Sequence, residues 1–185
     1  MSISQVNQGL LEYTVKNAIM NAICADYYCI MSSPIVLTPH RSCVNLEECA
    51  MRNYDTAEGL YNGGVLVSAA GDLLFIHCGK HDDGVIKLFC ESLSQWLRSL
   101  GLNSVISGND VLVDDYKVCG TTITRHGYID FGGAFVAMSV NLDDIRALCK
   151  KPMVKTPRGL SEYGITTDEL QKWFEYFVHN NLDLI

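Results

Sequence analysis

The sequence predicts an α+β fold in which a mixed β-sheet is flanked by helices. Three features indicate it: amphipathic stretches with helical spacing, several short apolar stretches typical of strands, and turn residues that join some of these strands as hairpins. Strands and helices do not alternate regularly, which favours α+β over a doubly wound parallel sheet. The length of 185 residues suits one domain, and we expect a single domain over residues 1–185.

The first part of the chain is predicted to contain two helices and one strand. Apolar residues recur at helical spacing over residues 11–23, which predicts an amphipathic helix. The apolar residues 35–37 are typical of a short strand. Asn45, with Glu48 three residues later, predicts a helix that starts with a capping box and ends near Tyr54.

The middle of the chain is predicted to contain a hairpin and a long helix. Residues 65–67 form one strand, and the turn residues 70–72 lead into its hairpin partner over residues 73–76. A clear helical stripe then runs over residues 85–100. Gly101 is the residue type preferred just after a helix end.

The last part of the chain is predicted to contain four strands followed by two helices. Thr166, with Glu169 three residues later, predicts the capped start of a final helix. Ahead of it we expect strands over residues 104–106, 111–113, 117–123 and 135–140, and a helix over residues 143–150.

Composition excludes several classes of function. The net charge is −7, and the 14 basic residues are scattered with no run longer than two, which argues against a nucleic-acid partner. No stretch approaches the roughly 20 apolar residues that cross a membrane. The first residues lack the basic head and apolar stretch of a signal peptide, so we expect a cytoplasmic protein without a membrane partner.

The eight cysteines are expected to be free thiols. Most lie among apolar neighbours, as small core residues do. The sequence contains no C-x-x-C pair, the pattern that would suggest a zinc or redox site. Disulfide frameworks belong to short secreted chains, so we expect no disulfide in the native protein.

The segment that indicates chemistry lies at residues 107–122. It is predicted to form a hairpin, with Asp110 at the start of one strand, Lys117 at the start of the next, and Gly120 close behind. Such an arrangement suits an ammonium and a metal-binding carboxylate around one phosphate. The alternative is an ordinary surface hairpin with a solvated lysine and aspartate, since a motif alone is only a hypothesis.

This segment resembles the lipoate–protein ligases, whose pattern is N-D-L/I-V followed about ten residues later by K-V/I-S/G-G-S/N-A. Biotin–protein ligases have a related pair of motifs. Asn109, Asp110, Lys117 and Gly120 stand at matching positions, and Cys119 replaces a family serine or glycine. Upstream, residues 62–73 resemble the family's G-G-G-A-V-x-H-D-x-G-N, and downstream, residues 131–142 resemble its F-x-H-G-x-L-L-x-N-x-D-L.

The resemblance implies the catalytic-domain fold of the biotin and lipoate ligases, which is similar to that of class II aminoacyl-tRNA synthetases. It implies ATP-dependent activation of a lipoyl- or octanoyl-type acid and transfer to a lysine of an acceptor domain, with ATP and Mg²⁺ required. Lys117 would be the electrostatic catalyst and Asp110 the Mg²⁺ ligand. The ligand-binding residues that it implies are Asn62, Gly63, Gly64, Val65, Gly120, Thr121 and Ala134.

The chain departs from the family at several polar positions. The two arginines that precede the family's glycines are replaced by the stretch that starts at Glu58, which adds negative charge. The family's His-Asp becomes Ser68-Ala69, its later His-Gly becomes Gly133-Ala134, and its Asn becomes Ser139. Arg41 or Arg52 could supply the missing charge. A second hypothesis is therefore a catalytically inactive binding or regulatory protein on the same fold.

Two other groups of residues are given structural roles. His77 and His81 are four residues apart in a cluster of potential metal ligands, but the sequence predicts a strand that ends at His77 and a solvated loop through Asp83. Cys119, beside Lys117, is expected to fill space in the core, as buried cysteines usually do, and not to act as a nucleophile.

Overall fold

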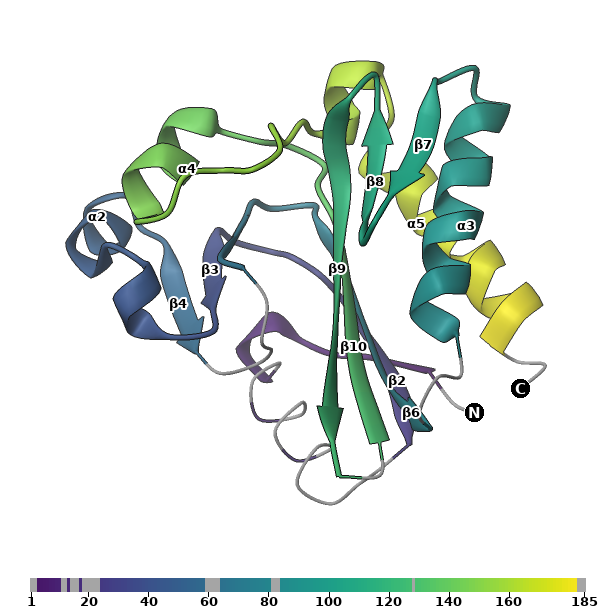
Figure 1. The fold of residues 1–185 in the computed structure, drawn as a ribbon, viewed down its shortest axis with the longest axis horizontal. Helices are drawn as coiled ribbons and strands as arrows, with labels where there is room; N and C mark the ends of the chain where they lie inside the picture. The colour runs from purple at the N-terminus through teal and green to yellow at the C-terminus, as the bar shows by residue number, and fades with distance from the viewer. Residues whose placement is uncertain are drawn as a thin grey trace.

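A computed structural model describes residues 3–10, 13, 17, 24–58, 64–80, 84–127 and 129–182. It contains a large sheet, a small sheet and helices on either side of them (Figure 1). The strands of the described residues are β1 (Ile3–Gln5), β2 (Ala25–Ile30), β3 (Ile35–Thr38), β4 (Asp55–Glu58), β5 (Leu66–Ser68), β6 (Leu73–Lys80), β7 (Ser104–Ser107), β8 (Asp110–Val113), β9 (Tyr116–His126) and β10 (Ile129–Val136). The helices are α2 (Leu46–Met51), α3 (Val85–Ser99), α4 (Leu142–Leu148) and α5 (Thr167–Phe177), with short 3₁₀ turns η1 (Gln8–Leu10), η2 (Arg41–Cys43) and η3 (Leu160–Tyr163) and a π-helical end η4 (Val178–Leu182).

The large sheet has the strand order β1-β2-β6-β10-β9-β8-β7, and the small sheet has the order β4-β3-β5. Most neighbouring strands are antiparallel, whereas the pairs β1–β2 and β3–β4 are parallel. The predicted mixed sheet with flanking helices is therefore confirmed. Among the described residues, no helix is long and apolar enough to cross a membrane.

Helices α3 and α5 cover one face of the large sheet, and the small sheet lies on the other side (Figure 1). The helix-covered face is the main core. Phe89 of α3 has no exposed surface, and its ring lies 5.3 Å from the rings of Phe75, Trp173 and Phe177. Aromatic contacts of this kind add to the free energy gained by burial. The apolar stripe at residues 85–100 thus packs as its periodicity predicts.

Several local predictions are confirmed. Thr166 and Glu169 form the predicted capping box of α5. Gly101 follows α3 with a positive φ of 85°, a conformation in which glycine is favoured. Asn45 caps α2 as predicted by accepting a hydrogen bond from the amide of Glu48. The Glu48 side chain, however, pairs with Arg52 and does not complete the predicted capping box, and the helix ends at Met51 and not near Tyr54. Most of the helix predicted over residues 11–23 lies outside the described residues.

The hairpin predicted for residues 65–76 is wrong. β5 pairs with β3 in the small sheet, whereas β6 pairs with β2 and β10 in the large sheet. Asp72 holds the turn between them: one of its oxygens accepts hydrogen bonds from Ser68 and Ala69, and the other accepts from the amides of Met138 and Ser139. The turn residues therefore connect two sheets and not two paired strands.

The predicted loop at residues 77–83 is also wrong over its first half. Residues 77–80 continue β6: β10 pairs with all four, and β2 also pairs with His77 and Cys78. His77 is buried, and its Nδ1 lies 2.6 Å from Oδ1 of the buried Asp26.

Two other predicted elements have different bounds. The strand predicted over residues 135–140 is β10, which begins at Ile129 and ends at Val136. The helix predicted over residues 143–150 is shorter than expected and ends at Leu148.

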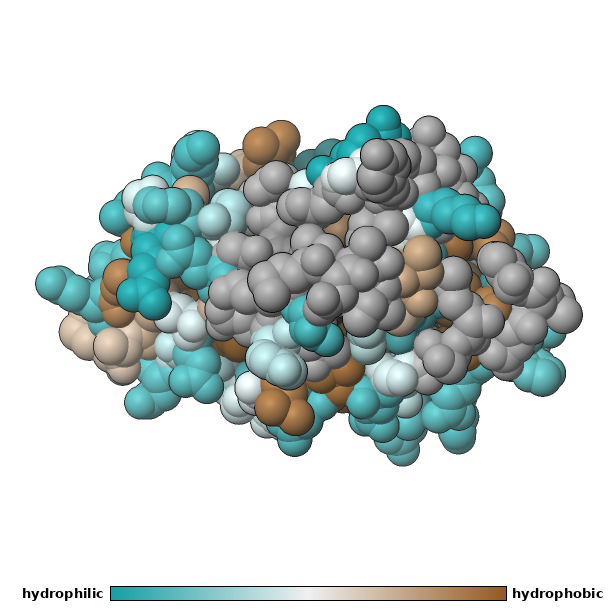
Figure 2. Space-filling model, turned by 90° about the horizontal axis from the view of Figure 1, so that it is seen from below, coloured by the Kyte–Doolittle hydropathy of each residue, from teal (hydrophilic) through white to brown (hydrophobic). Residues whose placement is uncertain are grey.

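On the surface seen from below, the described residues are mostly hydrophilic (Figure 2). On that face the described hydrophobic residues occur in small separate groups among hydrophilic ones (Figure 2). All eight cysteines are free thiols in the structure.

Candidate functional site

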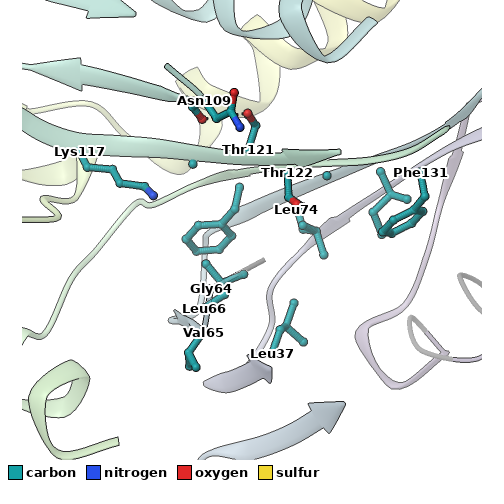
Figure 3. Close-up of a pocket in the computed structure, with 14 residues that line it drawn as sticks. Leu37, Gly64, Val65, Leu66, Leu74, Asn109, Lys117, Thr121, Thr122 and Phe131 are labelled. Carbon is teal, nitrogen blue, oxygen red and sulfur yellow. Dashed lines mark hydrogen bonds between the residues drawn. The ribbon is translucent and has the colours of Figure 1, made fainter. Parts of the chain in front are cut away.

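A cavity of about 330 Å³ lies between the large and the small sheet. Figure 3 shows it between the β9–β10 region on one side and the residues around Leu37 and Leu66 on the other, with Lys117 and Phe131 well apart along it. The apolar lining residues come from four strands. They are Leu37, Leu66, Leu74, Ile76, Phe131 and Phe135, together with Val65 just before β5.

The polar lining residues come from the β8–β9 region. They are Asn109, Lys117, Thr121 and Thr122, with Gly120 between them. The cavity therefore has an apolar part that suits a hydrocarbon chain and a polar part with a cation, which is the usual pattern of a small-molecule site.

The conformation of Lys117 depends on Gly120. The Lys117 side chain lies across Gly120, so that a Cβ at position 120 would come within 2.6 Å of Cε and 2.7 Å of Nζ. The turn at Asp114 and Asp115, both with positive φ, reverses the chain just before Lys117. A β-bulge between Val111 and Leu112 shifts the register of this strand pair. Together these features bring the ammonium to the cavity.

The carboxylate of Asp110 lies between two lysines. Nζ of Lys117 lies 2.7 Å from Oδ1, and Nζ of Lys155 lies 2.8 Å from Oδ2. Burial raises the pKa of Asp110, but the hydrogen bonds and charges of the two lysines outweigh it, so the pKa lies below its ordinary value. The group therefore carries a net positive charge next to the cavity.

Lys155 is a residue that the sequence analysis missed. It also donates hydrogen bonds to the carbonyl and the hydroxyl oxygen of Ser107, at 2.9 Å and 3.3 Å. No sequence pattern links it to Asp110, which is 45 residues away. The residues around it are fixed to β9, because the amide of Lys117 donates to the carbonyl of Thr156 and the amide of Arg158 donates to the carbonyl of Lys117.

This geometry does not fit the role of Asp110 as a Mg²⁺ ligand. Both carboxylate oxygens already accept a hydrogen bond from an ammonium group. In the described part of the chain, no group of three or more His, Cys, Asp or Glu side chains is arranged to hold a metal. A magnesium ion at Asp110 would lie beside two ammonium groups, whose positive charge repels a cation and already neutralises the carboxylate.

The other predicted ligand-binding residues are only partly brought together. Gly64, Val65, Gly120 and Thr121 line the cavity. Ala134 does not: its side chain is fully buried in the core on the helix-covered face, because neighbouring residues of a strand point to opposite faces. Asn62 and Gly63, which were also predicted to bind the ligand, lie outside the described residues.

The arginines that could replace the missing family charges are engaged elsewhere. Nε of Arg41 lies 2.9 Å from Oε2 of Glu58. Arg52 pairs with Glu48 and Asp144. Neither arginine lines the cavity. The charge of Glu58 is thus paired with Arg41, and Lys117 is the cationic residue that the described part of the chain brings to the cavity wall.

Cys119 has the role that the sequence analysis expected. It has no exposed surface and packs in the main core. Burial raises the pKa of its thiol well above the ordinary value. A thiol of this kind is not a nucleophile at neutral pH.

The fold is that of the catalytic domains of lipoate– and biotin–protein ligases. Residues 37–172 match the sequence profile of the lipoyl protein ligase A/B catalytic domain, and the chain belongs to this family. Among curated protein sequences no match is found.

Solved structures with the same fold agree with this assignment. A bipartite lipoate protein ligase from Thermoplasma acidophilum, studied with its E2 lipoyl domain, superposes with a TM-score of 0.77 at 17% identity, over 98% of this chain and 83% of that one. Protein Ta0514 of T. acidophilum, with bound lipoic acid, gives 0.75 at 16% identity, over 98% and 85%. A lipoate-protein ligase A bound with ATP gives 0.74 at 16% identity, over 99% and 84%. At such low identity these likenesses show the fold alone.

Proposed function

We propose that this protein is an ATP-dependent acyl-protein ligase of the lipoate type. It would activate a lipoyl- or octanoyl-type acid and transfer the acyl group to a lysine of an acceptor domain. The observation that carries this proposal is the position of Lys117 in the wall of a cavity that is otherwise largely apolar. Lipoic acid and ATP bound to relatives of the same fold, and the E2 lipoyl domain studied with one of them, support the substrate classes.

The apolar part of the cavity would hold the acyl chain. Leu37, Leu74 and Phe131 face it from both sheets. A chain buried there gains about 0.8 kcal/mol for each methylene group removed from water. The acid's carboxylate would then lie beside Lys117, since an ammonium group is the natural partner of a carboxylate in a partly dry site.

Two chemical steps would follow. The carboxylate oxygen attacks the α-phosphorus of ATP, which forms the acyl-adenylate and releases pyrophosphate. The neutral amine of an acceptor lysine then attacks the acyl carbonyl, which forms an amide and releases AMP, and the amine nitrogen loses a proton. Negative charge develops on phosphate and carbonyl oxygens in both steps, and Lys117 would stabilise it.

The Asp110 carboxylate would position Lys117. Because Lys155 contacts the second oxygen of the Asp110 carboxylate, the negative charge of Asp110 is shared between the two lysines. Lys117 therefore keeps hydrogen-bonding capacity for a ligand, since an ammonium group has three donors. No step of this proposal depends on a metal bound to Asp110.

A second candidate is a binding protein that retains the acyl site but does not catalyse transfer. The observation that favours it is that, among the described residues, no basic side chain other than Lys117 lines the cavity: Arg41 pairs with Glu58, and Arg52 pairs with Asp144. A nucleotide would then meet only Lys117.

Calorimetry with lipoate, octanoate, biotin and ATP, alone and in pairs, tests the proposal. We expect lipoate or octanoate to bind, and more tightly with ATP present. Biotin should bind more weakly, because the side chains of the apolar part, among them Leu66 and Ile76, offer no partner for its polar ring. Transfer is then measured by mass spectrometry of an apo E2 lipoyl domain. Acid binding without transfer to any acceptor would support the binding protein instead, and failure of every acid to bind would contradict both candidates.

A further inference from the structure

Although no run of basic residues in the sequence is longer than two, several of them fall close together in one segment of this acidic protein. Residues 146–158 contain five of the 14 lysines and arginines and no acidic residue, although the chain as a whole has a net charge of −7. The five are Arg146, Lys150, Lys151, Lys155 and Arg158. We call residues 146–158 the basic segment.

The basic segment is fixed at both ends and lies next to the cavity. Near its start, the amide of Lys150 donates to the carbonyl of Cys43. Near its end, Thr156 and Arg158 bond to the backbone of Lys117, the residue that lines the cavity. Lys155 reaches back to Asp110. The segment therefore borders the polar part of the cavity, where the acyl carbonyl would lie.

Part of its charge is available to a partner. Lys150 and Lys151 are exposed, and neither has an ion pair within the described residues. Arg146 pairs with Asp143 at 3.1 Å, but both side chains are more than half exposed, and pairs of this kind contribute little. Arg158 stacks on the ring of Tyr116 at 3.4 Å.

The segment also offers shape and an apolar contact. An open groove of about 650 Å³ has Arg146 and Arg158 in its wall, together with their partners Asp143 and Glu162. Val154, which lies between Lys151 and Lys155 in the sequence, is 99% exposed. A fully exposed apolar side chain among lysines suits a protein interface better than a nucleic-acid one, which is dominated by phosphate contacts.

We propose that the basic segment is the docking surface for an acidic acceptor protein, one that carries carboxylates next to the lysine to be acylated. This inference rests on the proposed function, because it places the acceptor beside the acyl carbonyl. Charge complementarity would attract the acceptor and align its lysine with the polar part of the cavity. The acidic remainder of the chain would repel the same partner elsewhere.

Backbone amide NMR with a synthetic probe tests this directly. The probe is a short peptide with one lysine between aspartates and glutamates, and its matched control has asparagine and glutamine in their places. We expect the acidic peptide to shift the amides of residues 146–158 at low salt. The neutral peptide should not shift them, and salt should reverse the effect because it screens exposed charges.

Two double variants make the test specific. Lys150→Glu with Lys151→Glu should weaken peptide binding by roughly tenfold or more. Arg98→Glu with Lys172→Glu changes the net charge equally, at exposed positions on α3 and α5, and should leave binding unchanged. Shifts elsewhere on the surface, equal weakening by both variants, or equal or tighter binding of single-stranded DNA of the same charge would each overturn the inference. So would the absence of any shift.

The same spectra separate this inference from the proposed function. Octanoate with ATP should shift the amides of Gly120 and Thr121, which line the cavity. If those shifts appear and the peptide shifts do not, the docking surface is refuted and the acyl site stands. If the peptide binds at the basic segment and no acid shifts the cavity amides, the ligase proposal fails. The basic segment then remains a docking surface for an acidic protein, without the acyl transfer.

Discussion

The two faces of the large sheet differ in what holds them together. The face under α3 and α5 is packed with aromatic rings: Phe75, Phe89 and Phe177 have no exposed surface. The opposite face packs against a small sheet and leaves a cavity of about 330 Å³ lined by Phe135, Lys117 and others. The comparison indicates that one face supplies stability and the other keeps space for a ligand.

The largest expected effect is on the packed face. Phe89→Ala should lower the free energy of unfolding by about 3–5 kcal/mol, because it removes a fully buried ring among four others. Phe135→Ala, at the cavity, should cost less than half as much, because Phe135 is only partly buried. Urea unfolding of both variants measures this. Equal costs would mean that the two faces do not differ as described.

The next effect concerns Asp72, which ties the two sheets together at their turn. Burial raises its pKa to about 6 even though Ser68 and the amides of Ala69, Met138 and Ser139 donate to it. Because the folded pKa is raised, its contribution to stability is present below about pH 4 and is lost as the pH rises through about 6. The difference between this pKa of about 6 and the ordinary value of 3.8 corresponds to roughly 3 kcal/mol of folding stability.

Asp72→Asn removes this titration. Relative to the variant, the wild type should therefore lose stability between about pH 4 and pH 7. Unfolding of both proteins in urea across this range is the measurement. Parallel pH profiles would show that Asp72 does not titrate there.

A smaller effect is expected for Gly120→Ala on the cavity face. The new methyl group collides with Cε and Nζ of Lys117, the mobile end of a flexible side chain, so the fold should persist while the ammonium moves. Affinity for an acyl-adenylate should fall roughly tenfold. Gly133→Ala is the matched control, because its methyl group enters the same cavity at an ordinary 3.6 Å from Thr122. If the two variants bind alike, Gly120 does not position Lys117.

The smallest effect is expected for the thiols. Intact mass spectrometry of protein purified with its thiols protected should show no disulfide. With a thiol reagent under native conditions, the exposed Cys24 should react before the buried Cys78 and Cys119. A mass lower by two hydrogens would reveal a bridge and contradict the expected reducing environment.

The sequence predicts the packed face much better than the cavity face. α3 follows from a regular apolar stripe, and α5 from a stripe with a capping box, because both signals are local. The cavity face depends on pairing between distant strands. The sequence therefore misassigns the partner of β5, which pairs with β3 and not with β6. It also ends β6 at His77, a residue that is polar but buried against Asp26.

The candidate site shows the same limit. The family resemblance locates Lys117, Gly120 and Gly64, which the structure brings to one cavity. It does not locate Lys155, because an ion pair across 45 residues leaves no local pattern. It assigns Ala134 to the ligand, whereas the alternation of β10 turns that side chain into the core and leaves Gly133 and Phe135 at the cavity.

The central claim is that Lys117 contacts an acyl-adenylate, and one titration tests it most directly. A lipoyl-adenylate is titrated calorimetrically into the wild type and into Lys117→Ala. A charge-assisted hydrogen bond contributes about 1.5–3 kcal/mol, so the variant should bind roughly tenfold to a hundredfold more weakly, with its unfolding free energy nearly unchanged. Equal affinity of the two proteins would contradict the claim and make Lys117 only the partner of Asp110.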